Sequence, residues 1–270
     1  MTVGIVGLGL FGGSLGLAVR ASGWGEVLAF DADPDACAQA TEFLVTDTAE
    51  ELAGAVDLLV LAAPPADNLT LLSRLAPLLR PDAVLTDVGS VKGPFAALAR
   101  AVLPERVVPS HPMAGSERHG LSAARADLFQ AATWPITPLP ENRPDAVERV
   151  EDLVRAVGAT PLRMTPEQHD RAVALTSHMP HVLAYALSAL AKEREAGGEP
   201  ISALAAGGFH SATRVAASSP ALWAQICLEN RENVLEALAD FRLVLEELTD
   251  ALASGDPAAL ERALAKGHKG

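Results

Sequence analysis

The sequence predicts an α/β protein in which an N-terminal, doubly wound parallel sheet precedes an all-helical second domain. Three observations carry this prediction. Short apolar runs alternate with amphipathic segments in the first half, a glycine-rich turn follows the first run, and strand-like runs vanish after about Thr165. Alternation of strands and helices requires crossover connections and therefore a parallel sheet. We place the domains at residues 1–165 and 166–270.

The strands of the first domain are predicted from apolar runs of four or five residues, and the helices from the amphipathic segments between them. The expected strands are Val3–Val6, Val27–Phe30, Leu58–Leu61, Ala83–Thr86 and Val107–Val108, with a further strand-like stretch from Thr133. The expected helices are Gly13–Ala21, Pro34–Thr41, Asn68–Leu79, Pro94–Val102 and Pro144–Val157.

The second domain shows helical signals alone. Thr165 is a suitable N-cap and Pro166 suits the first helical position, so a helix is expected to begin there. Ser219 precedes another proline in the same way and begins a long amphipathic segment. Gly255 ends that segment, and a short final helix is expected after it.

Composition narrows the possible function. The 270 residues carry a net charge of −13, which argues against a nucleic-acid or anionic-membrane partner. Hydrophobic residues make up 49%, enough for a sizeable core, but no apolar run is long enough to span a bilayer. The two cysteines, Cys37 and Cys227, show neither metal-ligand spacing nor a disulfide framework. With no signal-peptide pattern at the N-terminus, we expect a cytoplasmic protein.

A dinucleotide site is predicted at the N-terminus. Gly7, Gly9 and Gly12 form the pattern Gly-x-Gly-x-x-Gly between a predicted strand and a predicted helix, which is typical of Rossmann-type domains. Asp31 ends the second strand, where an acid binds the ribose hydroxyls and repels a 2′-phosphate, so NAD is expected over NADP. Asp33 is the alternative ribose ligand. The competing interpretation is that these glycines serve only turns and packing.

Two polar residues follow neighbouring predicted strands. Ser90 comes after the strand at Ala83–Thr86, and His111 comes after Val107–Val108 and precedes a proline. Ligands bind at the carboxyl ends of strands in open parallel sheets. A neutral histidine there accepts a hydroxyl proton as hydride leaves, and Ser90 would orient that imidazole or the substrate hydroxyl. The alternative is that both residues only form turns or satisfy local hydrogen bonds.

The helical domain adds candidate binding residues. His178 and His181 are three residues apart and share a helix face, with a break expected at Pro180, but no third metal ligand follows with suitable spacing. We therefore expect no metal. Arg214 lies among small residues, which suits a pocket for a carboxylate, since its guanidinium makes two parallel hydrogen bonds. A surface salt bridge is the alternative for Arg214.

Four ordered motifs follow the glycine pattern: "TDVGSVKG", "HPMAGSE", "HDRAVALTSHMPH" and "GFHSATRVAASSPALW". Together they resemble the prephenate/arogenate dehydrogenase family of tyrosine biosynthesis over nearly the whole chain. The resemblance implies NAD-dependent oxidative decarboxylation of prephenate to 4-hydroxyphenylpyruvate. It also implies a homodimer formed through the helical domain.

The resemblance assigns roles to individual residues. His111 matches the catalytic histidine that hydrogen-bonds the ring hydroxyl, and Ser90 matches the serine that helps to hold that histidine and the substrate. Arg214 matches an arginine that binds a substrate carboxylate. His181 matches a substrate-binding histidine.

Three further positions match the family motifs. Ser116 and Glu117, in "GSE", match substrate-binding positions, with Glu117 as a gating or binding acid. Asp170, in "QHD", matches a polar position whose role is left open.

The sequence departs from the family pattern at one place. The family often has Phe-Arg-Asp-x-Thr-Arg where this chain has "FHSATR", so Ser211 replaces an acid. This departure leaves arogenate, which bears an amine in place of the keto group, as an alternative substrate. A 3-hydroxyacid dehydrogenase shares the domain plan, but such enzymes rely on a lysine in the helical region. A non-catalytic NAD-binding module is the alternative outside the enzymes.

Overall fold

The first half of the chain forms a five-stranded parallel sheet. The computed structural model describes residues 1–115 and 118–268. The strand order is β3-β2-β1-β4-β5, and every neighbouring pair is parallel. The strands are β1 (Thr2–Val6), β2 (Glu26–Phe30), β3 (Leu44–Val45), β4 (Leu58–Leu61) and β5 (Val84–Asp87). The order reverses between β1 and β4, and this switch point is where such sheets bind ligands.

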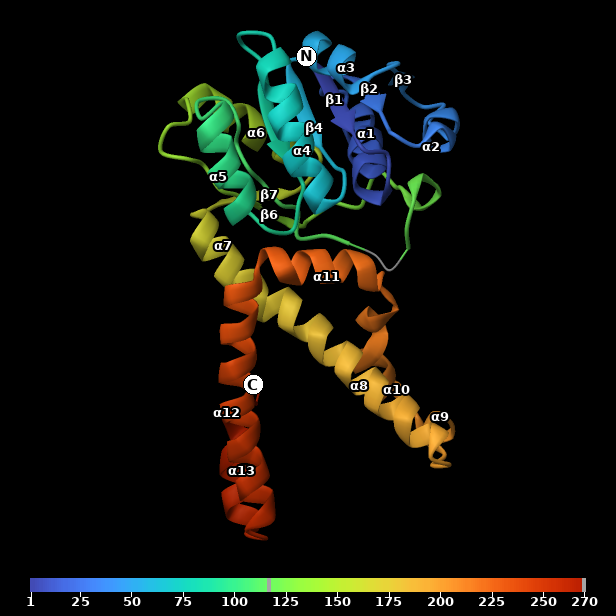
Figure 1. The fold of residues 1–270 in the computed structure, drawn as a ribbon, viewed down its shortest axis with the longest axis vertical. Helices are drawn as coiled ribbons and strands as arrows, with labels where there is room; N and C mark the ends of the chain where they lie inside the picture. The colour runs from blue at the N-terminus through green and yellow to red at the C-terminus, as the bar shows by residue number, and fades with distance from the viewer. Residues whose placement is uncertain (116–117, 269–270) are drawn as a thin grey trace.

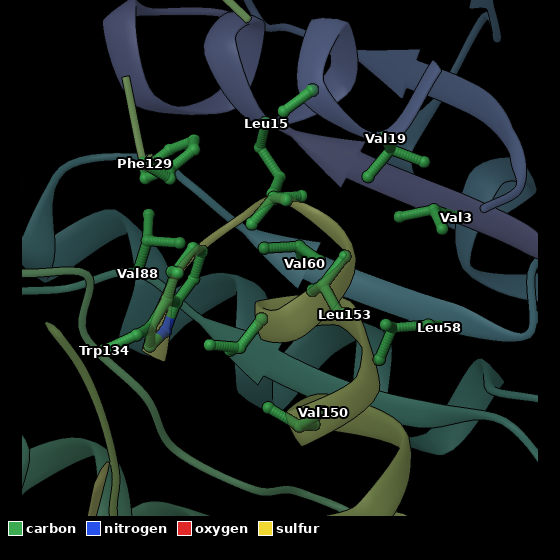
Figure 2. Packing of buried hydrophobic residues seen from close by; sticks show 14 of the residues in the cluster. Val3, Leu15, Val19, Leu58, Val60, Val88, Phe129, Trp134, Val150 and Leu153 are labelled. Carbon is green, nitrogen blue, oxygen red and sulfur yellow. The ribbon is translucent and has the colours of Figure 1, made fainter. Parts of the chain in front are cut away.

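Helices cover both faces of this sheet because side chains alternate across each strand (Figure 1). One face packs on α1 (Leu10–Ser22) and α6 (Pro144–Ala156), and Figure 2 shows Leu15, Val60 and Leu153 in that core. The other face packs on α3 (Ala49–Ala55), α4 (Pro65–Leu75) and α5 (Gly93–Val102). The short α2 (Pro34–Gln39) follows β2. The predicted α/β class with a doubly wound sheet is confirmed.

The chain after α5 differs from the prediction at one strand. Val107–Val108 forms no strand: Val107 makes an isolated parallel bridge to Leu85, and the backbone-to-backbone hydrogen bonds beside β5 stop after Val108 N–H donates to Leu85 O at 2.8 Å. Pro109 follows and has no N–H to continue the ladder. The stretch from Thr133 does form a strand, β6 (Thr133–Ile136), which pairs in parallel with β7 (Thr160–Arg163) as a separate small sheet.

The second half is helical. Thr165 caps α7 (Pro166–Val173), accepting from Gln168 N–H at 3.2 Å, as its sequence predicts. Figure 1 shows α11 (Pro220–Glu229) lying beneath the sheet, with α8 (Met179–Ala196) and the α12–α13 pair running away from it in diverging directions. The remaining helices are α9 (Ile201–Leu204), α10 (Gly207–Thr213), α12 (Arg231–Ala253) and α13 (Pro257–Ala265). Within the described residues, no helix combines the length and apolar composition needed to cross a bilayer.

Two local features of this half were not expected. The segment after Ser219 is not one helix, because the chain breaks at Asn230 between α11 and α12. A single π-helical turn, Ala174–His178, joins α7 to α8 just before Pro180, so the helix continues without the expected break. The two features meet, because the Asn230 side chain donates to Asp170 O at 2.7 Å and lies 3.1 Å from Nδ1 of His178.

Candidate active site

A cleft of about 1460 Å³ lies between the sheet half and the helical half. The last residues of four strands lie side by side at the edge of the sheet that borders the cleft. Val6 pairs with both Phe30 and Leu61, and Leu61 pairs with Asp87. Its lining includes most of the residues that the sequence singles out: Gly7, Gly9, Asp31, Asp33, Ser90, His111, His181 and Arg214. Two other candidates, Ser116 and Glu117, lie outside the described residues.

The glycine turn has the shape that a dinucleotide requires. Gly7 has φ +101°, a conformation that glycine adopts without strain, and a Cβ on Gly12 would lie 1.8 Å from Gly7 O. At Gly9 a Cβ would meet no atom within 4 Å, so the backbone faces open space in the cleft. Gly9 also begins α1 without a side-chain cap. The first N–H groups of α1 are therefore available to a pyrophosphate.

The two candidate ribose acids have different local partners. The Asp31 carboxylate accepts from Leu8 N–H at 2.6 Å and from Asp33 N–H at 2.8 Å, which fixes it beside the glycine turn. The Asp33 carboxylate accepts from Asp35 N–H at 3.0 Å and caps α2. Both side chains line the cleft. Because both carboxylates also accept from backbone N–H groups, Asp31 stays the predicted ribose ligand and Asp33 its alternative.

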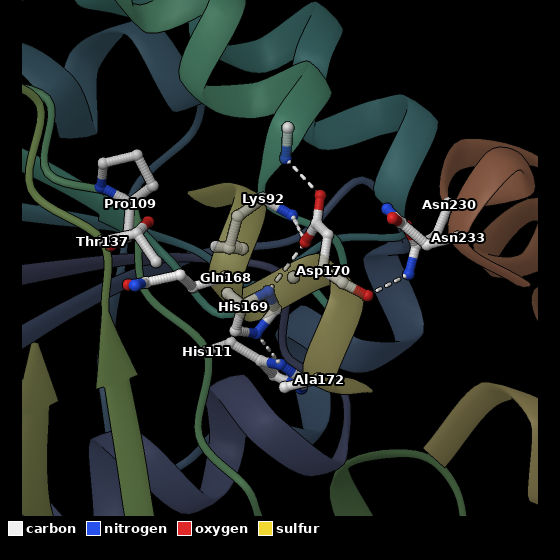
Figure 3. Close-up of polar contacts among 12 residues, drawn as sticks. Lys92, Pro109, His111, Thr137, Gln168, His169, Asp170, Ala172, Asn230 and Asn233 are labelled. Carbon is white, nitrogen blue, oxygen red and sulfur yellow. Dashed lines mark hydrogen bonds and ion pairs between the residues drawn. The ribbon is translucent and has the colours of Figure 1, made fainter. Parts of the chain in front are cut away.

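His111 is buried, with 7% of its surface exposed, where the cleft meets the helical half. Its backbone N–H donates to Pro135 O at 2.9 Å, which ties it to β6. Its Nδ1 lies 2.9 Å from Nε2 of His169, and Nδ1 of His169 lies 2.7 Å from an oxygen of Asp170 (Figure 3). The candidate base thus belongs to a linked series of three polar side chains.

The burial of His111 favours its neutral form. Burial lowers the pKa of His111 well below its ordinary value, and the neighbouring His169, Lys92 and His178 lower it further. Asp170, the acid of the series, is held in its charged form instead. Burial alone would raise the pKa of Asp170, but hydrogen bonds from His169 and from two backbone N–H groups outweigh it and lower that pKa. At neutral pH the site therefore holds a neutral imidazole linked to an ionised carboxylate.

Ser90 does not hold His111 in this structure. The sequence assigned it to orient either the imidazole or the substrate hydroxyl, but within the described residues no hydrogen bond joins Ser90 to His111. The hydrogen-bond partner of His111 Nδ1 is His169 instead, because α7 brings that side chain directly against His111. Ser90 lines the cleft, so a contact with substrate stays its predicted role.

The helical half supplies the opposite wall of the cleft. Arg214 begins the short 3₁₀ segment Arg214–Ala217, and His181 stacks on Trp223 with ring centroids 3.4 Å apart. The Nδ1 of His181 lies 2.9 Å from Ser177 O. Burial and the nearby Arg214 lower the pKa of His181, so it is neutral near pH 7. Arg214 stays the predicted ligand of a substrate carboxylate, and two further arginines, Arg74 and Arg118, also line the cleft.

His178 does not share this wall with His181. It is fully buried behind the cleft, with Nδ1 3.1 Å from Nδ2 of Asn230. In residues 1–115 and 118–268 there is no group of three or more His, Cys, Asp or Glu side chains arranged to hold a metal ion.

A buried ion pair lies next to the segment that carries His111. Lys92 is fully buried, pairs with Asp87 and donates to Ser110 O at 2.7 Å. Asp87 also accepts from Ser110 N–H at 3.1 Å and from Gly89 N–H at 2.9 Å. Burial raises the pKa of Asp87 and lowers that of Lys92, so their mutual attraction is needed to keep both charged. The pair fixes the segment that carries His111.

Sequence reasoning overlooked His169, Trp223 and the structural role of Lys92. All three lie inside the motifs quoted above. The helix cap predicted at Thr165 could have pointed to His169, which lies four residues after it. A helix that begins at Pro166 places residues 169 and 170 near its N-terminal end. In the structure this end lies against His111 and the start of α5.

Comparison with known proteins agrees with this architecture. A family model described as "Prephenate dehydrogenase, nucleotide-binding domain" matches residues 15–162, and one described as "Prephenate dehydrogenase, dimerization domain" matches residues 165–266. The chain is 35% identical over 243 residues to the prephenate dehydrogenase of Bacillus subtilis, an alignment that covers 87% of this chain but 66% of that protein.

Two further relatives support the same grouping. The chain is 38% identical over 214 residues to the cyclohexadienyl dehydrogenase of Zymomonas mobilis, covering 78% of this chain and 73% of that protein. The crystal structure of Aquifex aeolicus prephenate dehydrogenase with hydroxyphenyl propionate and NAD+ superposes with a TM-score of 0.92 at 29% identity, covering 98% of this chain and 95% of that one. With both family models matched in order over most of its length, the chain belongs to the prephenate dehydrogenase family.

Proposed function

We propose that this protein catalyses the NAD-dependent oxidative decarboxylation of prephenate to 4-hydroxyphenylpyruvate, a step of tyrosine biosynthesis. One observation carries the proposal: a single cleft joins the glycine turn, a buried neutral His111 and Arg214. A dinucleotide, a base and a cation for a carboxylate are the parts that this reaction needs. The matched family and the NAD+-bound relative support the same assignment.

The chemistry divides between cofactor and protein. Bound NAD would supply the acceptor for the hydride that leaves the carbon bearing the ring hydroxyl of prephenate. His111 takes the hydroxyl proton as that carbon becomes a carbonyl centre. The ring carboxylate then leaves as carbon dioxide, and its bonding electrons complete the aromatic ring and make the new carbonyl oxygen a phenolate. That oxygen takes the proton back from His111, which gives the phenol and restores the neutral imidazole. Aromatisation drives the loss of carbon dioxide, so the protein need not stabilise a separate decarboxylation step strongly.

The residues of the cleft have distinct roles in this proposal. Gly7, Gly9 and Gly12 let the pyrophosphate approach the N-terminus of α1, and Asp31 binds the ribose. Arg214 binds a substrate carboxylate. The neutral His181 offers hydrogen bonding without charge. Ser90, Ser116 and Glu117 keep their predicted substrate contacts.

Arogenate is the second candidate substrate. It differs from prephenate only in the side chain, where an amine replaces the keto group, and Ser211 stands in α10 where the family often has an acid. A 3-hydroxyacid substrate has less support, because such enzymes use a lysine and the described lining of the cleft contains none. Lys92 does not supply one, since it is fully buried against Asp87.

We also propose a homodimer formed through the helical half. Large apolar side chains are exposed along α8, α12 and α13, and a dimer interface would bury such side chains. They are Leu187, Leu190, Leu235, Leu243, Val244, Leu245, Leu252 and Leu264. Residues 1–165 and 166–270 would then be the cofactor and dimerisation domains. Two free thiols, Cys37 and Cys227, suit the reducing cytoplasm.

The test is an assay of NADH or NADPH formation with three substrates and two cofactors. Prephenate, arogenate and 3-hydroxyisobutyrate are each supplied with NAD and with NADP. We expect prephenate with NAD to give the highest kcat/KM. Faster turnover of arogenate would select the alternative substrate, and turnover of 3-hydroxyisobutyrate alone would refute the proposal.

A further inference from the structure

We propose that His169 and Asp170 are positioning residues that hold the proton of His111 on Nδ1, so that Nε2 is the acceptor offered to the substrate hydroxyl. This inference rests on the proposed function, in which His111 is the base. It adds that the base works in one tautomer only, and that α7 selects this tautomer.

The carboxylate end of the series is fixed by backbone donors. One oxygen of Asp170 accepts from Lys92 N–H at 2.7 Å, and the other accepts from Gly93 N–H at 2.7 Å (Figure 3). These N–H groups lie at the N-terminus of α5, where a negative charge is stabilised. Asp170 therefore acts as an ionised acceptor, and Nδ1 of His169 must donate to it at 2.7 Å.

The ionised Asp170 carboxylate determines where the protons of the two histidines lie. His169 is fully buried, and each of its ring nitrogens has one hydrogen-bond partner, Asp170 at Nδ1 and His111 at Nε2. A neutral His169 with its proton on Nδ1 has a lone pair on Nε2. The Nδ1 of His111, 2.9 Å away, must then be the donor. His111 keeps Nε2 as its one acceptor, and within the described residues no protein atom is hydrogen-bonded there.

The series also stabilises the product of proton transfer. When His111 becomes an imidazolium, its Nδ1–H donates through His169 toward the Asp170 carboxylate, as a carboxylate does for the histidine of a serine-protease triad. Other charged groups face this series. Lys92 and His178 face His111, and Lys92 faces Asp170 together with Glu229 from the end of α11. Among these neighbours, Asp170 is the carboxylate that is hydrogen-bonded into the series.

Nitrogen-15 NMR of the histidine rings in the enzyme without substrate reads the tautomer directly. We expect His111 to carry its proton on Nδ1 and His169 to carry its proton on Nδ1. A His111 ring protonated on Nε2 would overturn the inference. Because no substrate is present, this result is independent of the proposed function, which fails separately if prephenate yields no NADH.

Kinetics of Asp170→Ala supply the second readout, with Glu229→Ala as the matched control. Glu229 is a nearby carboxylate, but within the described residues nothing hydrogen-bonds to it. We expect Asp170→Ala to lower kcat by roughly 10²-fold with little change in KM. Its acid limb in the kcat/KM profile should move to lower pH, because the imidazolium loses its carboxylate. Glu229→Ala should keep the wild-type limb. If Asp170→Ala folds and its acid limb stays at the wild-type pH, the inference is contradicted. If the variant does not fold, the NMR measurement on the wild-type protein still tests the inference.

Discussion

The Nδ1 of His111 lies 2.9 Å from the Nε2 of His169, and this contact joins the sheet half to the helical half at the candidate base. His111 follows the edge of the sheet, whereas His169 belongs to the first helix beyond it. The position of the base therefore depends on how α7 packs against the loop before α5. A change at that packing would alter catalysis without touching substrate.

Removal of the base gives the first prediction. We expect His111→Asn to lower kcat with prephenate by on the order of 10²–10⁴-fold, the usual contribution of a general base. NAD binding, measured by quenching of tryptophan fluorescence, should stay within a factor of a few. Turnover at the wild-type rate would show that another group takes the proton.

Cofactor choice gives the second prediction. Asp31→Ala should weaken NAD binding and relax the rejection of NADP, since the carboxylate that repels a 2′-phosphate is gone. Asp33→Ala is the control, and it should cost about 1 kcal/mol of stability through loss of the α2 cap. Titration of both variants with NAD and NADP checks this. A preference altered only in Asp33→Ala would move the ribose site to that residue.

Carboxylate binding gives the third prediction. We expect Arg214→Ala to raise KM for prephenate roughly 10–100-fold, because a charge-assisted hydrogen bond contributes about 1.5–3 kcal/mol. Arg214→Lys keeps the charge but loses the paired geometry, so its KM should lie between those of the wild type and Arg214→Ala. Initial rates at varied prephenate measure both. An unchanged KM in Arg214→Ala would remove Arg214 from the binding site.

The buried ion pair gives the fourth prediction. Lys92→Met leaves the Asp87 carboxylate buried without its partner and should lower the free energy of unfolding by about 3–5 kcal/mol. The double variant Lys92→Met/Asp87→Asn should recover part of that loss, since no unpaired charge remains. Urea unfolding of the three proteins tests this. Equal stability of the wild type and Lys92→Met would mean that the pair contributes nothing.

Acid sensitivity gives the fifth prediction. Burial lowers the pKa of His178 from 6.5 to about 4, although Asp170 opposes the change. Between these values the unfolded chain binds more protons than the folded chain, so stability is full above 6.5 and falls as pH decreases toward 4. At about pH 5 this single group should cost roughly 2 kcal/mol relative to neutral pH. Urea unfolding of His178→Gln should show a smaller loss; an identical loss would exclude His178.

The fold class was predictable because it depends on local patterns. Runs such as Leu58–Leu61 and the turn at Gly7–Gly12 specify a strand and a phosphate turn with short-range signals. The strand β3 (Leu44–Val45) and helix α3 were missed because both are too short to show a period. Val107–Val108 looked like a strand by composition, but Pro109 ends its hydrogen bonding.

The site was predictable in part for the same reason. His111, Ser90 and Arg214 stand in recognisable motifs, and the structure brings all three to one cleft. The partner of His111 was not predictable, because the contact with His169 joins residues 58 positions apart. The π-helical turn at Ala174–His178, which contacts α7, α8 and α12, was not expected from the sequence either.

The amounts of NADH and carbon dioxide formed from prephenate by the purified protein test the central claim most directly. We expect the two to appear in equal amounts, with 4-hydroxyphenylpyruvate as the organic product, and both to be lost together in His111→Asn. NADH without carbon dioxide would contradict the claim, as would no NADH from prephenate when NAD is bound.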